Sequence, residues 1–381
     1  MAPTAKRDVL FIVSELLGNG AYSRFILNAV QEIPEITPHV ISWGAPDYAT
    51  YKPARIARFS ESFSASEMMR QKLEGFLDTC PVKQFDALFL QSFELMPFLH
   101  PYIAKYPAIV ACDGTSTAAH DLVARKRIVE GGFSLRERIV KRVKGAITTP
   151  WYRRTANRVD LFMPWTRWCA NSLRNDFGVA ESRMMIAPSG LDMNVWKPNL
   201  ARRTATKRLL FVGNEFERKG GPFLLRAFTQ HIHPAAELHI VSNDASLREE
   251  LLPAGVTLHR GLGVRDKTAL VALYQSADVF VFPTQLDRMG LVLAEAAATG
   301  APIVATDVGG VSQICRPDEN GSLVPLAASE HTFAEQVLRI LGDDALAARY
   351  SRRGRQIAEQ ELSHEAMART VRSAFDRLFQ Q

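Results

Sequence analysis

The sequence predicts an α/β protein made of two doubly wound domains, each with a parallel sheet. Three observations lead to this prediction. Short apolar, β-branched runs alternate with helical patterns along the chain. The 381 residues are enough for two separate hydrophobic cores. A polar stretch without apolar periodicity, residues 198–207, lies between the halves and is interpreted as a linker.

Each half is expected to contribute its own set of strands. In the first half the expected strands are Val9–Val13, His39–Trp43, Ala87–Gln91, Ala108–Cys112, Leu161–Pro164 and Met185–Ala187. In the second half they are Arg208–Val212, Glu237–Val241, Thr257–His259, Val279–Phe282, Pro302–Ala305 and Ser322–Val324. The sequence therefore places the two domains at residues 1–197 and 208–362.

The composition is that of an ordinary globular protein, with 47% hydrophobic and 23% charged residues. No apolar run approaches the roughly 18 residues of a membrane span, and the run Val9–Val13 is too short for a signal peptide. A cytoplasmic location is therefore expected. The formal net charge of +6 favours anionic partners, but it does not distinguish nucleotides, phospholipids and nucleic acids.

The cysteine pattern and the acidic residues give no sequence signal for two kinds of metal site. The four cysteines are scattered and form no C-x-x-C pair, so reduced thiols are expected instead of disulfides or a zinc site. No Asp-x-Asp triplet occurs, and this removes the usual sequence signal for a metal-bound diphosphate. The sequence therefore predicts no metal and no other cofactor.

The segment 283–295 carries the strongest functional signal. It follows the apolar run Val279–Phe282, which is interpreted as a buried strand. Asp287 lies on the loop after this strand, Gly290 opens an alanine-rich helix, and Glu295 lies just over one turn inside that helix. A helix start offers N–H groups and a positive dipole to phosphate, while carboxylates accept hydrogen bonds from hydroxyls. Both features together suit a nucleotide-sugar.

This segment resembles the signature of retaining glycosyltransferase family 4, in which two glutamates enclose a Gly-Phe-Gly-Leu-like stretch. Asp287 stands in the place of the first glutamate and Glu295 in that of the second. Between them lie Met289, Gly290, Leu291 and Val292. The resemblance implies the GT-B fold, in which two Rossmann-like domains face each other across a cleft. It also implies that the last helix, expected within 363–381, crosses back to the first domain.

The second domain opens with a strand followed by a loop with adjacent cations and two glycines. Arg218 and Lys219 precede Gly220 and Gly221 in this loop, and two cations beside a helix start suit a diphosphate. The alternative is a solvated surface turn. The loop resembles the family pattern Gly-Arg-x-x-x-x-Lys-Gly, whose arginine and lysine bind the nucleotide's phosphates. Lys219 keeps the lysine place, whereas Asn214 stands where the arginine usually does, with Arg218 as its substitute.

Two segments of the first half also resemble family positions. Gly18, Asn19 and Gly20 follow the first strand, where the family places a glycine pair whose N–H groups face the sugar-nucleotide. A lone Gly-x-Gly is common in turns and helix starts. Asp113 and Thr115 resemble the Asp-x-Thr motif of a subgroup, at a position that lines the acceptor side. Asp113 would orient the acceptor hydroxyl or share its proton, or alternatively cap the following helix.

A basic stretch covers residues 125–158, and apolar residues recur at helical spacing within it. A basic amphipathic helix of this kind can lie on an anionic membrane surface, which would place the chain at the inner face of the membrane. In the alternative interpretation, the apolar stripe packs on its own sheet and the basic face is simply solvated. Nucleic acid is not expected, because no recognised binding motif accompanies the charge.

The resemblance predicts a retaining, metal-independent hexosyltransferase that moves a sugar from a nucleotide-diphosphate sugar to a sugar, lipid-linked or other hydroxyl acceptor. Its role would lie in bacterial glycolipid, polysaccharide or other glycoconjugate synthesis. The expected catalytic residues are Asp113, Asp287, Arg218 and Lys219. The expected donor-binding residues are Gly18, Asn19, Gly20, Arg218, Lys219, Asp287, Met289, Gly290, Leu291, Val292 and Glu295.

Two alternatives stay open. One is a non-catalytic subunit that binds nucleotide-sugar, suggested by the departures at Asn214 and Asp287. The other is a GT-B enzyme of another reaction type, an epimerase or a phosphorylase. A phosphorylase would need a cofactor site, and the sequence contains no signal for one.

Overall fold

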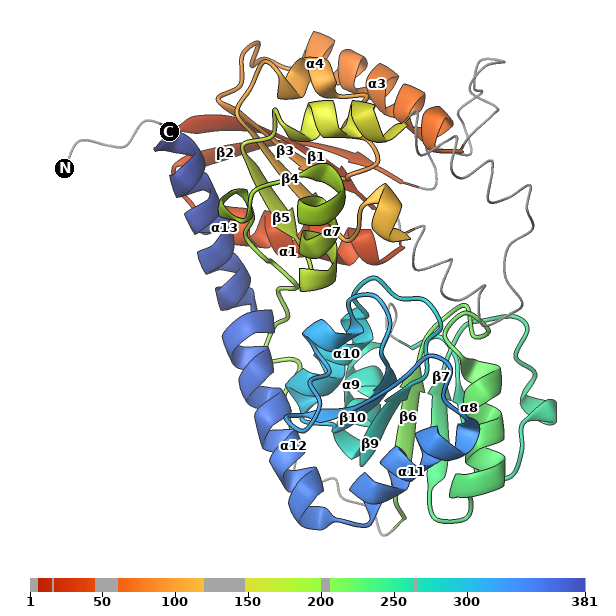
Figure 1. Ribbon diagram of the computed structural model, residues 1–381. Helices are drawn as coiled ribbons and strands as arrows, with labels where there is room; N and C mark the ends of the chain where they lie inside the picture. Colours follow the sequence, from red (N-terminus) through yellow and green to blue (C-terminus); the bar gives the residue numbers. More distant parts are fainter. Residues whose placement is uncertain are drawn as a thin grey trace. The chain divides into compact units, whose positions relative to one another are not determined.

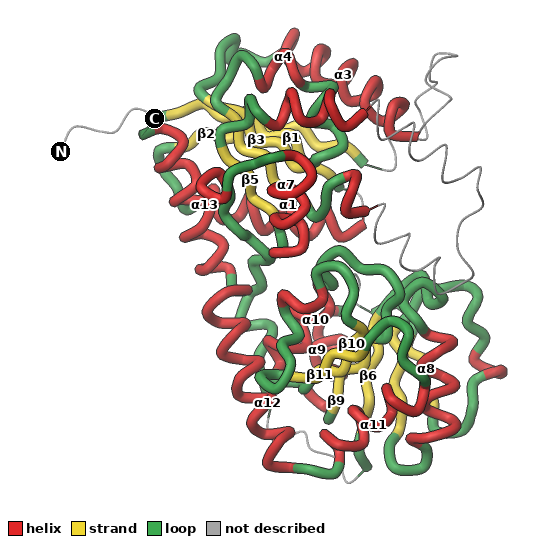
Figure 2. The backbone as a smooth tube through the Cα atoms, viewed as in Figure 1, coloured by secondary structure: helices red, strands yellow, loops and turns green. Residues whose placement is uncertain are grey.

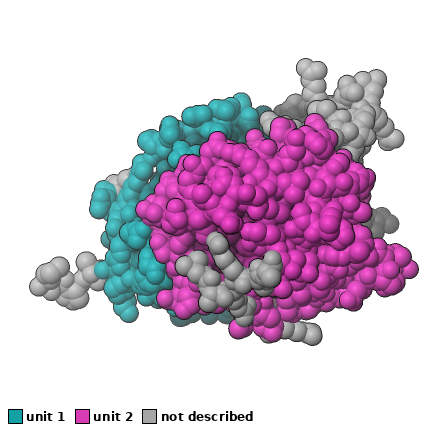
Figure 3. All heavy atoms as spheres, turned by 90° about the horizontal axis from the view of Figure 1, so that it is seen from below, with its two compact units in different colours: residues 1–121, 133–190, 364–381 teal, residues 122–132, 191–363 magenta. Residues whose placement is uncertain are grey.

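The computed structural model describes residues 6–15, 17–44, 61–119, 148–199, 206–262 and 266–380. These residues form two compact units (Figure 3). The described residues up to Gly190 and those from His364 onward form unit 1, and those from Leu191 to Ser363 form unit 2. Most of the basic stretch, up to residue 147, and most of the expected linker lie outside the described residues.

Unit 1 is built on a parallel sheet of five strands in the order β2-β1-β3-β4-β5. The strands are β1 (Arg7–Ser14), β2 (Ile36–Trp43), β3 (Ala87–Gln91), β4 (Ala108–Cys112) and β5 (Leu161–Pro164). Every residue of β3, β4 and β5 is buried. Parallel strands covered by helices on both faces need such continuous apolar runs.

The helices of unit 1 come from both ends of the chain. They include α1 (Leu17–Gln31), α3 (Glu61–Thr79), α4 (His100–Ile103), α7 (Arg167–Phe177) and α13 (His364–Phe379). The last helix, α13, packs against α1 (Figure 1). The Arg372 guanidinium on α13 donates to the carbonyl oxygen of Glu32, just after α1, at 2.7 Å. Unit 1 is therefore complete only with the carboxyl-terminal helix.

Unit 2 is built on a parallel sheet of six strands in the order β11-β10-β9-β6-β7-β8. The strands are β6 (Arg208–Val212), β7 (Glu237–Val241), β8 (Val256–His259), β9 (Val279–Phe282), β10 (Ile303–Thr306) and β11 (Gly321–Val324). The helices are α8 (Gly221–Ala227), α9 (Lys267–Ser276), α10 (Leu291–Thr299), α11 (Glu330–Leu341) and α12 (Asp344–Ile357). Helices flank each sheet (Figure 2), so the predicted pair of doubly wound parallel sheets is confirmed.

One expected strand does not form. Residues Met185–Ala187 adopt no regular strand, although the N–H groups of Met185 and Ala187 donate to the carbonyl oxygens of Phe162 and Pro164 at 2.9 and 3.0 Å. The segment therefore follows the edge strand β5 without a full ladder of hydrogen bonds. Within the described ranges, no helix is long and apolar enough to cross a membrane.

Candidate functional site

The candidate site lies at the carboxyl edge of the unit 2 sheet, where β6 and β9 are neighbours. The chain leaves β6 toward α8, which packs on α11, and leaves β9 toward α10, which packs on α9 and α12. Neighbouring strands whose connections run in opposite directions leave a crevice between their ends, and ligands of open α/β sheets bind there. The loops 213–220 and 283–290 follow these two strands and lie side by side at this edge.

A glycine allows the two loops to approach each other closely. Gly220 has φ +80°, and a Cβ atom built on it would lie only 1.8 Å from the carbonyl oxygen of Pro283. The N–H of Gln285 donates to the carbonyl oxygen of Arg218 at 3.1 Å. Only glycine combines this backbone conformation with such a close contact. The sequence pattern of cations followed by glycines thus fixes the loops side by side.

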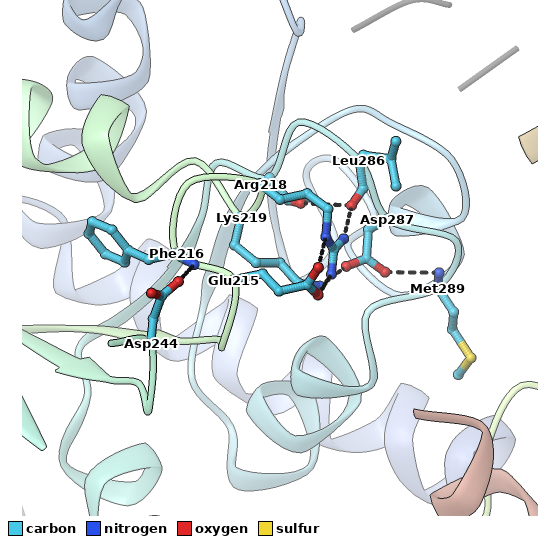
Figure 4. Close-up of polar contacts among 9 residues, drawn as sticks. Glu215, Phe216, Arg218, Lys219, Asp244, Leu286, Asp287 and Met289 are labelled. Carbon is cyan, nitrogen blue, oxygen red and sulfur yellow. Dashed lines mark hydrogen bonds and ion pairs between the residues drawn. The ribbon is translucent and has the colours of Figure 1, made fainter. Parts of the chain in front are cut away.

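Lys219 and Asp287, both predicted from the sequence, form an ion pair across the two loops (Figure 4). The side chains are 16% and 8% exposed, so the pair is largely shielded from water. The other carboxylate oxygen of Asp287 accepts from the N–H of Met289 at 3.1 Å. The Lys219 ammonium also lies 5.0 Å from the centre of the Phe282 ring. A charge-assisted bond with low exposure fixes both side chains.

Arg218 is held by a carboxylate that the sequence motif does not specify. Its Nε donates to Glu215 Oε1 at 3.1 Å, and its Nη2 pairs with Glu215 Oε2. Its Nη1 donates to the carbonyl oxygen of Leu286 at 2.6 Å. The hydrogen bond from Arg218 lowers the pKa of Glu215 below its ordinary value. Arg218 and Lys219, the two cations of the loop 213–220, therefore both bond to oxygen acceptors of the protein (Figure 4).

The start of α10 adds backbone donors to the same edge. Gly290 precedes the helix with φ +71°, and Leu291 and Val292 occupy its first turn. Helix starts carry N–H groups without intrahelical partners and a positive dipole. Deeper in the helix, Glu295 accepts a hydrogen bond of 2.8 Å from the Tyr274 hydroxyl. Burial raises the pKa of Glu295 to about 7, although this hydrogen bond lowers it.

Asn214, at the place of the family arginine, has a structural contact. Its side-chain oxygen accepts from the N–H of Asn243 at 2.8 Å, and Asn243 in turn accepts from the N–H of Gly261 at 2.7 Å. These bonds connect the loops that follow β6, β7 and β8. Arg218 is thus the residue that supplies a guanidinium to this loop.

The remaining predicted residues belong to unit 1. Gly18, Asn19 and Gly20 lie in the first turn of α1, and the Asn19 carbonyl accepts from Gln91 Nε2 at 2.9 Å. Asp113 follows β4 directly. The hydroxyl of Thr115 accepts from the N–H of Ala118 at 3.0 Å, so Thr115 caps the helix that begins at residue 116.

Sequence reasoning missed Glu215 and Tyr274. Glu215 has φ +56°, a left-handed conformation that a non-glycine residue rarely adopts, and no motif specifies it. Tyr274 lies on α9, and only the three-dimensional packing of α9 on α10 brings it to Glu295. An apolar helical stripe that ends in a tyrosine was the available signal, and it does not indicate a polar partner.

Comparison with known proteins supports a relationship to GT-B glycosyltransferases. The family described as "Glycosyl transferases group 1" matches residues 206–343. A D-inositol 3-phosphate glycosyltransferase of Xylanimonas cellulosilytica is 30% identical over 217 residues, 50% of this chain and 50% of that protein. A phosphatidyl-myo-inositol mannosyltransferase of Mycobacterium leprae is 29% identical over 212 residues, 54% of each chain. The chain spans about half the length of the curated relatives it matches.

Solved structures show the same fold across nearly the whole chain. A sucrose-phosphate synthase from Thermosynechococcus elongatus aligns with a TM-score of 0.75 at 18% identity, covering 98% of this chain and 100% of that one. HepE of Anabaena, solved with UDP-glucose, aligns with a TM-score of 0.65 at 14% identity, covering 97% and 99%. At these identities the likeness concerns the fold, and the fold is GT-B.

Proposed function

We propose that this chain transfers a sugar from a nucleotide-diphosphate sugar to a hydroxyl acceptor, with retention of the anomeric configuration. One observation carries the proposal. Lys219 and Arg218 meet Asp287 and the start of α10 at the carboxyl edge of β6 and β9. This combination offers cations and N–H groups to a diphosphate and a carboxylate to sugar hydroxyls. The group 1 family match over residues 206–343 supports the same conclusion.

Donor binding would be an exchange of partners. In the structure, Asp287 uses one oxygen for Lys219 and the other for the N–H of Met289. We expect a diphosphate to take the Lys219 ammonium, which would release an Asp287 oxygen for a sugar hydroxyl. The N–H groups of Leu291 and Val292 would face the phosphate oxygens. Glu295 would accept hydrogen bonds from the ribose hydroxyls.

The chemical step would break the bond between the anomeric carbon and the phosphate oxygen. The acceptor oxygen would attack on the same face, and its proton would pass to the departing phosphate. The main work of the protein is then to stabilise charge on the leaving diphosphate with Arg218, Lys219 and the α10 N–H groups. These fixed cations would take the place of a metal. Asp113 and the Gly18–Gly20 turn would serve the acceptor side and the donor from unit 1.

A donor panel tests this function. Purified protein is incubated with UDP-, GDP- and ADP-sugars, and thermal shifts and slow donor hydrolysis are recorded. We expect stabilisation by one nucleotide class and hydrolysis that Lys219→Ala lowers by a factor of about 100 or more, because an electrostatic contact to the leaving group is lost. Lys105→Ala, an exposed lysine of unit 1, is the control and should keep activity.

The outcomes separate the alternatives. If no nucleotide-sugar stabilises the protein, the proposal is wrong. Binding without hydrolysis or transfer to any acceptor would instead identify a non-catalytic nucleotide-sugar-binding subunit.

We further propose that the acceptor is reached at the inner face of an anionic membrane. Trp151 is 40% exposed, and Arg153, Arg154 and Arg158 beside it are exposed as well. An exposed tryptophan among arginines is typical of a surface that binds anionic lipid.

Co-sedimentation with anionic and neutral vesicles across a salt series tests this proposed membrane contact. Binding to anionic vesicles that weakens with salt, and weakens further in Trp151→Ala, is expected. Equal sedimentation with neutral vesicles would contradict it.

A further inference from the structure

Glu215 is a carboxylate on the loop after β6, at an unspecified position of the Gly-Arg-x-x-x-x-Lys-Gly pattern. Its backbone has φ +56°, which costs conformational energy for any residue with a Cβ atom. A backbone outlier beside two cations requires an explanation from the contacts of its side chain. Both carboxylate oxygens of Glu215 bond to one residue, Arg218.

These contacts occupy one edge of the guanidinium and leave another edge available. Glu215 engages Nε and Nη2, and the carbonyl oxygen of Leu286 accepts from Nη1. A guanidinium has five N–H groups in a fixed plane. Three of them thus bond to described residues, and two remain for a ligand. Because the plane is rigid, holding one edge sets the direction of the other.

The orientation of Arg218 matters because this residue supplies the guanidinium group of the loop 213–220. Asn214, at the place of the family arginine, instead accepts a hydrogen bond from the loop after β7. A long arginine side chain has many rotamers, and a ligand that must order it binds more weakly. The Glu215 carboxylate and the Leu286 carbonyl order it in advance. The side chain of Arg218 is 30% exposed and that of Glu215 55% exposed, so the pair lies at the water-facing side of the loop.

We propose that Glu215 is a positioning residue that holds Arg218 toward the diphosphate of the nucleotide-sugar. The inference rests on the proposed function, because it takes the diphosphate as the ligand of Arg218. In the alternative, Glu215 would weaken diphosphate binding, because its carboxylate would neutralise the charge of Arg218 and repel the phosphates. The bidentate contact on the Nε edge favours positioning, since it leaves one N–H of Nη1 and one of Nη2 for the ligand.

A double-mutant cycle with nucleotides tests this. UDP, GDP and ADP, each beside its monophosphate, are titrated calorimetrically into the wild type, and the best-binding diphosphate and its monophosphate are then used. Glu215→Gln should weaken diphosphate binding by about 5- to 10-fold and change monophosphate binding by less than about 2-fold. Arg218→Ala should show the same selectivity. In the Arg218→Ala background, Glu215→Gln should have no further effect, because no guanidinium remains to be oriented.

Glu217→Gln is the matched control. Glu217 is exposed, lies two positions along the same loop, and carries the same charge. A general loss of negative charge near phosphate would make both variants bind the diphosphate more tightly. Tighter binding by Glu215→Gln, an equal effect on monophosphate, or an unchanged effect in the Arg218→Ala background would each overturn the proposal.

The test also separates this inference from the proposed function. If the wild type binds none of the nucleotides, the proposed function fails and the inference fails with it. If the wild type binds a diphosphate and Arg218→Ala weakens it while Glu215→Gln does not, the proposed function stands and the positioning role is wrong.

Discussion

At the residue scale, the surroundings of Glu295 change the chemistry of its carboxyl group. It lies on α10 with its side chain directed to the Tyr274 hydroxyl at 2.8 Å. Burial raises its pKa to about 7, while the Tyr274 hydrogen bond and the Lys267 charge lower it. A group that is half protonated near neutral pH changes both stability and ligand binding over a narrow pH range.

Glu295→Gln should remove a pH dependence of stability. The folded pKa of about 7 lies above the ordinary value of 4.5, so the protonated form is favoured by folding. The resulting stability is fully present below pH 4.5 and is lost as the pH rises through 7. The wild-type free energy of unfolding, relative to that of Glu295→Gln, should fall by up to about 3 kcal/mol between pH 5 and pH 8. Urea denaturation at several pH values measures this difference.

Tyr274→Phe is the matched variant for this measurement. It removes the hydrogen bond that lowers the pKa of Glu295, so the loss of stability should move to higher pH. The free energy of unfolding relative to Glu295→Gln is followed with pH for the wild type and for Tyr274→Phe. If this difference stays constant with pH in both cases, Glu295 titrates in the folded protein as it does in water, and the prediction is wrong.

The sequence motifs identify the candidate site residues one by one, but they do not predict the contacts between them. Lys219 and Asp287 follow different strands, 68 positions apart, and each was identified from its own motif. Their ion pair depends on β6 and β9 being neighbours, and a sequence of alternating strands and helices does not specify the strand order. The role of Glu215 depends on a left-handed backbone, for which glycine, not glutamate, would have been the signal.

At the scale of elements, continuous apolar runs made the buried strands predictable. The run Val279–Phe282 forms β9 with all four residues buried, as expected for a central parallel strand. Met185–Ala187 also contains apolar residues but pairs only with the edge strand β5, so it gains too few hydrogen bonds to form a regular strand. Sequence pattern indicates apolar character, whereas the place in the sheet decides whether a strand forms.

Glycines that end or begin helices were the other reliable element-level signal. Gly290 and Gly300 have φ +71° and +76° and enclose α10. Gly178, with φ +72°, ends α7. Because a left-handed backbone is energetically unfavourable for residues with a Cβ atom, these glycines define the helix limits. They place the start of α10 at the sheet edge. The position of the candidate phosphate site therefore follows from the sequence to within a few residues.

At the scale of the whole molecule, the chain leaves unit 1 at Gly190 and returns to it at His364. The returning helix α13 buries Val371, Phe375 and Leu378. The Phe375 ring lies 6.0 Å from that of Phe11 on β1, so a segment from the end of the chain completes the core around the first strand. The stability of unit 1 should therefore depend on residues that follow unit 2 in the sequence.

Phe375→Ala tests this dependence. Phe375 is 2% exposed, and removing a buried phenyl ring costs about 3–5 kcal/mol. Hydrogen exchange followed by mass spectrometry should show faster exchange in the peptides of β1 and β3, while β9 exchanges as in the wild type. Phe333→Ala is the control, because Phe333 is 1% exposed within the core of unit 2. This substitution should accelerate exchange in β9 but not in β1 or β3. If either variant accelerates exchange equally in β3 and β9, the two units unfold as one and the dependence assigned to unit 1 is wrong.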